Sequence, residues 1–170
     1  KFILDVDLEI KEPNKSYKKY NYNNSVIFYY FIRIVDEKIN IKILIAKDFK
    51  NLYLQFIGAF IFDLSSKYQA SLININYKGS NTKILDNLYF GFKRKDYIYN
   101  EYLSNSKKEQ FQSNFKLSSK NSSLLESINF MKLLVSLPSN ILYPKTYCDF
   151  IKKNINSKKI DINYYNEDKI

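Results

Sequence analysis

The alternation of apolar and acidic residues at the start of the chain is the feature that most restricts its fold. Leu4, Val6, Leu8 and Ile10 fall on one side of the segment 2–10, and Asp5, Asp7 and Glu9 fall on the other. A period of two is typical of a β-strand with one buried face and one solvated face. The segment therefore predicts a half-buried strand.

Further strands are predicted along the first half of the chain. The runs 26–35 and 39–46 are rich in β-branched and aromatic residues, and the polar turn 36–38 separates them. The run 52–60 continues this pattern, and 71–77 fits either a strand or the edge of a helix, whereas 11–24 lacks an apolar period and predicts a loop. Because the connections between the first strands are short, they favour an antiparallel meander over a parallel sheet.

The second half changes to helical patterning. A helix is expected from Thr82 to about Phe90, a longer one from Ser122 to Leu137, and a short one after Pro144. Residues 91–120 are polar and weakly patterned, and 157–170 offers at most a fraying strand. We therefore expect an α+β fold: one domain over 1–170, with an antiparallel sheet part (1–77) followed by a helical part (78–170).

Composition limits the chemistry of the chain. With no His and one Cys among 170 residues, it has no Ser-His catalysis, no intrachain disulfide and no cysteine-based metal cluster. The 27 Lys and Arg against 17 Asp and Glu give a net charge of +10, which favours RNA, DNA or an anionic membrane surface as partner. All but two of these cations, Arg33 and Arg94, are Lys, and a bias toward A and T in the coding sequence explains the Lys excess equally well. No apolar run is long enough to predict a membrane-spanning helix.

Two segments carry a resemblance to a known family. Residues 31–60 include Asn51-Leu52-Tyr53 followed by Gly58, and residues 77–85 include Tyr77, Gly79 and Asn81. Together they resemble the sheet region of the ribosome-inactivating proteins, the rRNA N-glycosylases of the ricin A-chain and Shiga toxin type. The chain is shorter than the usual domain of that family, which is compatible with an incomplete domain.

The resemblance implies a site for removing adenine from the large-subunit rRNA, which inhibits translation. It implies that Tyr53 stacks on the flipped base, that Glu126 stabilises an oxocarbenium-like sugar, and that Asn81 and Asn129 contact the substrate. The helical Glu and Phe of the family motif match Glu126 and Phe130, but Asn129 stands where the family has Arg. The ribosome would be the partner, with no metal and no other cofactor.

Simpler interpretations stand beside this one. Tyr53 suits a partly buried aromatic, Glu126 a first-turn helical carboxylate, and Asn81 a helix N-cap. Lys93 and Arg94, close to Tyr97 and Tyr99, suit either an RNA-binding patch or a solvated face. The alternative function is a non-catalytic basic domain that binds nucleic acid or a partner protein. Removal of a secretion signal would explain a chain that begins at Lys1.

Overall fold

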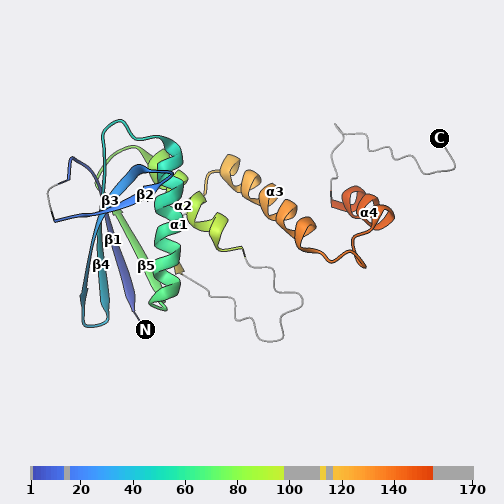
Figure 1. The fold of residues 1–170 in the computed structure, drawn as a ribbon, viewed down its shortest axis with the longest axis horizontal. Coiled ribbons are helices and arrows are strands. Elements are labelled where there is room, and N and C mark those ends of the chain that lie inside the picture. The colour runs from blue at the N-terminus through green and yellow to red at the C-terminus, as the bar shows by residue number, and fades with distance from the viewer. Residues whose placement is uncertain (1, 14–15, 98–111, 114–116, 155–170) are drawn as a thin grey trace. The chain divides into compact units, whose positions relative to one another are not determined.

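The protein is described here from a computed structural model, which places residues 2–13, 16–97, 112–113 and 117–154 (Figure 1). The strands are β1 (Ile3–Ile10), β2 (Lys18–Tyr22), β3 (Ser25–Val35), β4 (Lys38–Ile45), β5 (Leu72–Tyr77) and β6 (Gln112–Ser113), and the helices are α1 (Asn51–Lys67), α2 (Thr82–Lys95), α3 (Ser119–Ser136) and α4 (Pro144–Asn154). This arrangement confirms the α+β class. The chain divides into two compact units, Lys1–Asn129 and Phe130–Ile170. That both belong to one domain stays a prediction.

The first unit contains a mixed sheet with strand order β2-β3-β4-β1-β5-β6. β2, β3 and β4 are antiparallel neighbours, whereas β1 pairs in parallel with both β4 and β5. Asn23 and Asn24, with φ of 47° and 61°, form the tight turn between β2 and β3. Two consecutive positive φ angles are characteristic of the type I′ hairpin turn, which Asn tolerates well.

The hydrophobic core lies between the sheet and the helices α1 and α2. Leu4, Val6 and Leu8 of β1 are at most 2 % exposed, as their alternation predicts. They pack with alternate residues of β4 and β5 and with the inner faces of the two helices, which lie on the same side of the sheet (Figure 1). The sheet is therefore covered by helices on one face.

Two glycines bring α1 and α2 into close contact. A Cβ atom added to Gly58 of α1 would collide with the backbone oxygen of Leu88 and lie 2.6 Å from the backbone nitrogen of Phe92, both on α2. A Cβ atom on Gly91 of α2 would collide with the backbone of Gln55 on α1. The helix backbones touch at these points, which leaves no room for a side chain.

The strand predicted over 52–60 is wrong, because this segment lies in α1. Its buried residues Leu54, Ile57, Ile61 and Leu64 recur every three or four positions, which is the spacing of one helix face. A window that ends at residue 60 shows aromatic and β-branched residues but hides this period. The error also hid the helical connection from β4 to β5 that a parallel arrangement requires, so the predicted antiparallel meander is wrong for β1 and β5.

Other boundaries differ for local reasons. Residues 18–22 form an edge strand rather than a loop: Tyr20 stacks on Phe28 with 4.5 Å between ring centroids, and Tyr22 lies 4.5 Å from the ring of Phe56 on α1. Residues 71–77 contain strand β5, and α2 continues to Lys95. Residues 98–111 and the strand suggested over 157–170 lie outside the described residues.

The start of α3 is fixed by a carboxylate within the first unit. Asp86 on α2 accepts hydrogen bonds from the Ser118 backbone N–H at 2.8 Å and from Asn121 Nδ2 at 2.7 Å. The Ser118 hydroxyl also donates to Asp86, at 2.8 Å. These contacts satisfy groups at a helix N-terminus, where a negative charge is favoured.

The second unit contains the end of α3 and the helix α4. Phe130 stacks on Phe150 with 5.7 Å between ring centroids, and Leu134 is 6 % exposed. Met131 and Val135 are far more exposed, at 61 % and 84 %. Among the described residues, this unit therefore buries only part of its apolar surface.

Candidate functional site

The face of the sheet that points away from α1 and α2 combines charged, amide and aromatic side chains with a few aliphatic ones. We call it the open sheet face. It is defined by Lys19 on β2, Tyr29, Phe31, Arg33 and Val35 on β3, Lys38, Asn40, Lys42 and the buried Leu44 on β4, Ile3, Asp5, Asp7 and Glu9 on β1, and Leu72, Asn74 and Asn76 on β5. Most of these residues are half-buried or exposed, and no described helix covers them. Side chains that alternate along a strand fall on opposite faces, so the acidic residues of β1 lie on this side.

The strand register aligns these side chains in rows across the sheet. Asn40 lies between Arg33 on one neighbouring strand and Asp5 on the other, and Asp5 in turn lies opposite Asn74. The Asn74 Nδ2 donates to Asp5 Oδ1 at 2.8 Å. In the next row, Asn76 Nδ2 donates to Asp7 Oδ1 at 3.1 Å. Each of these two carboxylates is thus stabilised by an amide from β5.

The third acidic residue of β1 is paired with a cation. The Lys42 Nζ lies 3.1 Å from Glu9 Oε1. This hydrogen bond raises the pKa of Lys42 above its ordinary value, with smaller contributions from Tyr17, from the charge of Glu9 and from Asp7. Since both partners are partly exposed, water screens the ion pair. The pair therefore orients the two side chains more than it stabilises the fold.

The half of the open sheet face formed by β2, β3 and β4 combines aromatic rings with cations. Phe31 is 45 % exposed, and the ring of Tyr17 lies 6.2 Å from it between centroids. Lys19 lies opposite Tyr29, and Lys42 opposite Phe31, on the neighbouring strands. Exposed rings beside cations form a surface that suits flat, anionic ligands.

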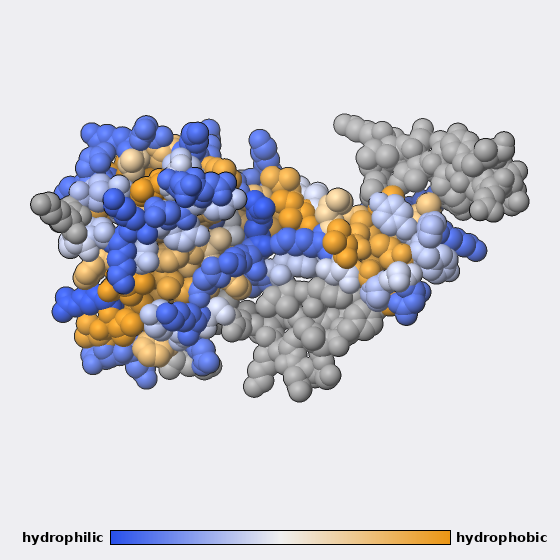
Figure 2. All heavy atoms as spheres, in the orientation of Figure 1, coloured by the Kyte–Doolittle hydropathy of each residue, from blue (hydrophilic) through white to orange (hydrophobic). Residues whose placement is uncertain are grey.

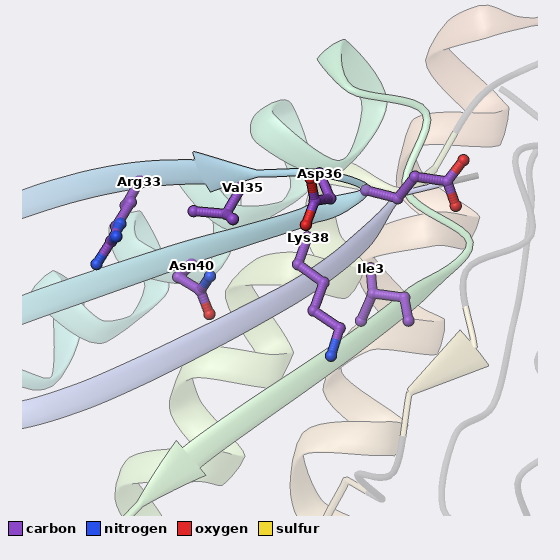
Figure 3. Close-up of a pocket in the computed structure, with 7 residues that line it drawn as sticks. Ile3, Arg33, Val35, Asp36, Lys38 and Asn40 are labelled. Atoms are coloured by element: carbon purple, nitrogen blue, oxygen red, sulfur yellow. The ribbon is translucent and has the colours of Figure 1, made fainter.

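A hollow of about 740 Å³ lies at the end of this face where residues 36–37 form the hairpin turn between β3 and β4. Its lining residues are Ile3, Arg33, Val35, Asp36, Glu37, Lys38 and Asn40. Figure 3 shows Arg33, Lys38 and Asn40 on the viewer's side of the sheet, with the helices behind it. In Figure 2, apolar and hydrophilic atoms adjoin at the lower left, where Figure 1 places this hairpin.

The residues of the resemblance are spread over three helices. Tyr53 lies in the first turn of α1, partly buried against the core, and not on a strand. Glu126 is exposed in the middle of α3, where the Ser122 hydroxyl approaches its Oε1 at 3.4 Å, so it is not a first-turn carboxylate. Among the described residues, no hydrogen bond joins Tyr53 to Glu126.

The two asparagines of that set differ in their surroundings. Asn81 is the N-cap of α2, and its side-chain oxygen accepts from the Lys83 backbone N–H at 3.1 Å. The Oδ1 atom of Asn129 is buried and has no hydrogen-bond partner within the described part of the chain. Asn81 therefore has a structural role that explains its presence.

The cations at the end of α2 make local contacts. Lys93 Nζ lies 3.1 Å from Asp96 Oδ2 and above the ring of Tyr89. Arg94 donates to Gln55 Oε1 at 3.0 Å. Tyr99, which the sequence places beside Lys93 and Arg94 in a candidate RNA-binding patch, lies outside the described residues.

Comparison with known proteins leaves the family of the chain open: no protein-family model matches it, and no curated protein matches it. No described helix is long and apolar enough to cross a membrane. Within the described ranges, no group of three or more His, Cys, Asp and Glu residues is arranged to hold a metal ion. The open sheet face is the candidate site because the strand register aligns its cations, rings and amides on one surface.

Proposed function

We propose that the protein is a non-catalytic nucleic-acid-binding module whose open sheet face binds single-stranded RNA or DNA. The observation that carries the proposal is the side of β2, β3 and β4 where exposed Phe31 lies among the cations Lys19, Arg33 and Lys42. Bases stack on aromatic rings while cations neutralise phosphates, and this combination tolerates many sequences. The net charge of +10 supports the same class of partner.

A single strand fits this face better than a duplex. The rings of Tyr29 and Phe31 stand on one strand two positions apart, and residues so spaced share a face of the sheet. A base must be unstacked from its neighbours to lie on such a ring, and unpaired bases meet this requirement readily. The neighbouring amides of Asn40 and Asn74 can donate to or accept from base edges.

The acidic residues of β1 determine where a bound nucleic-acid strand can lie on the open sheet face. Asp5 and Asp7 each accept an amide hydrogen bond, and Glu9 is paired with Lys42. Acidic side chains repel a phosphate backbone and cations attract it, which favours β3 and β4 over β1. We therefore place the backbone along the β2, β3 and β4 half, with base edges directed toward the amides.

Fluorescence anisotropy with labelled single strands of about ten nucleotides tests this function. We expect binding that weakens steeply between about 50 and 200 mM salt, because phosphate neutralisation releases counterions. Phe31→Ala should weaken binding by about 1–3 kcal/mol, the usual contribution of one stacked base. Phe31 is almost half exposed, so this change should leave the fold intact, which circular dichroism verifies.

A charge-matched comparison separates the open sheet face from general basicity. Arg33→Gln with Lys42→Gln removes two cations from this face, and Lys47→Gln with Lys50→Gln removes two exposed cations between β4 and α1. We expect the first pair to weaken binding much more than the second. Equal losses in the two double variants, or a Phe31→Ala variant that binds like the parent protein, would refute the proposal.

The rRNA N-glycosylase activity that the resemblance implies stays a prediction. Its two central residues, Tyr53 and Glu126, lie on α1 and α3, and the family's Arg is Asn129 here. The binding function is preferred because it rests on side chains that the strand register aligns on one surface.

A further inference from the structure

The hollow at the hairpin end of the open sheet face combines an apolar floor with two cations. Val35 and Ile3 both flank Lys38 in the strand register, and Val35 is 42 % exposed. Arg33 and Asn40 are opposite each other in the next row. Lys38 lies between the two apolar residues in the register, so a planar ring can pack on Val35 beside the methylene stem of Lys38 while the Asn40 amide reaches its edge.

The two cations lie on neighbouring strands, on either side of Asn40 (Figure 3). Arg33 lies opposite Asn40, and Lys38 precedes Asn40 by two residues, so Arg33 and Lys38 are diagonal neighbours. Diagonal neighbours are about 7–8 Å apart, so side chains of this length can both turn toward one phosphate group. Among the described residues, no ion pair or hydrogen bond engages either side chain. Both remain available to an anion.

The turn between β3 and β4 limits how far a bound nucleic-acid strand can extend beyond the hollow. Asp36, with φ of 53°, and Glu37 form the turn beyond the hollow and line its outer side. The Asp36 carboxylate would repel a phosphate backbone that runs on past this turn. A nucleotide in the hollow is therefore best placed at the end of its strand.

We infer that this hollow binds the phosphate-bearing end of a single nucleic-acid strand. The terminal ring packs on Val35 beside the methylene stem of Lys38, and the phosphate lies between the Arg33 guanidinium and the Lys38 ammonium. A terminal phosphate carries about two negative charges near neutral pH, whereas an internal phosphate carries one, so two cations favour the terminal group. This inference rests on the proposed function, since the rest of the strand lies on the open sheet face.

Three strands of identical sequence test the inference: one with hydroxyls at both ends, one with a 5′-phosphate and one with a 3′-phosphate. We expect one phosphorylated strand to bind about tenfold more tightly than the hydroxyl strand. Arg33→Gln with Lys38→Gln should abolish this preference, whereas Lys47→Gln with Lys50→Gln should preserve it. Phe31→Ala should weaken the binding of all three strands and leave the preference in place.

The outcomes separate the two proposals. Equal affinity for all three strands would overturn the end-binding inference while the open sheet face remains a binding surface. A preference that survives Arg33→Gln with Lys38→Gln would also overturn it, because the phosphate would then lie elsewhere. Failure of all three strands to bind would refute the proposed function itself.

Discussion

Replacing Gly58 by Ala should separate α1 from α2 and destabilise the first unit. The added Cβ would meet the backbone oxygen of Leu88 and the backbone nitrogen of Phe92, and backbone atoms cannot rotate away as a side chain can. Overpacking of this kind costs about 3 kcal/mol at its upper range. Since Ala favours a helix over Gly by about 1 kcal/mol, the net loss should be about 2 kcal/mol.

Thermal unfolding followed by circular dichroism measures this loss, and a decrease in Tm of about 4–8 °C is expected for a chain of this size. Gly79→Ala is the matched control. The atoms nearest to a Cβ added there belong to the side chain of Tyr77, which can move, so its effect should be much smaller. A Gly58→Ala protein that is as stable as the parent or more stable would refute the close approach of the two helices.

Three further predictions follow from other contacts. Asp86→Ala should destabilise the start of α3 by about 1–3 kcal/mol, because three donors lose a charged acceptor; faster amide exchange there would show it, and unchanged exchange would contradict it. Glu9→Gln should lower the pKa of Lys42 toward its ordinary value in an NMR titration; because that pKa is raised by folding, the pair stabilises at neutral pH and loses its effect as pH rises above about 10. If the protein removes adenine from ribosomes, Tyr53→Ala and Glu126→Gln should each abolish adenine release measured by mass spectrometry, and release that persists in both variants would exclude this pair.

Local periodicity predicted individual elements well. The alternation from Leu4 to Leu8 identified β1 and its buried side, and the helical spacing in the second half identified α2, α3 and α4. The segment 52–60 failed because its aromatic content suits a strand, whereas its core contacts follow a helical period that continues beyond it. Gly58 was first interpreted through a motif, but contact between α1 and α2 explains it.

The candidate site could not be predicted from the sequence, because it depends on which distant strands pair and in which register. Asp5 and Asn74 are separated by 69 positions, and their hydrogen bond requires β1 and β5 to be neighbours in one register. The signal available in the sequence was the acidic side of β1, which a strand with one solvated face must expose. Nothing local indicated that Arg33 would align in the same row.

Mapping the contact surface of a bound single strand tests the central claim most directly. Ultraviolet crosslinking followed by peptide mass spectrometry identifies the side chains that touch bases. The open sheet face predicts crosslinks at Phe31 and Tyr29, which disappear in the Phe31→Ala and Tyr29→Ala variants. Crosslinks that are absent from β3 and gather instead beside Lys93 and Arg94 on α2 would contradict the account.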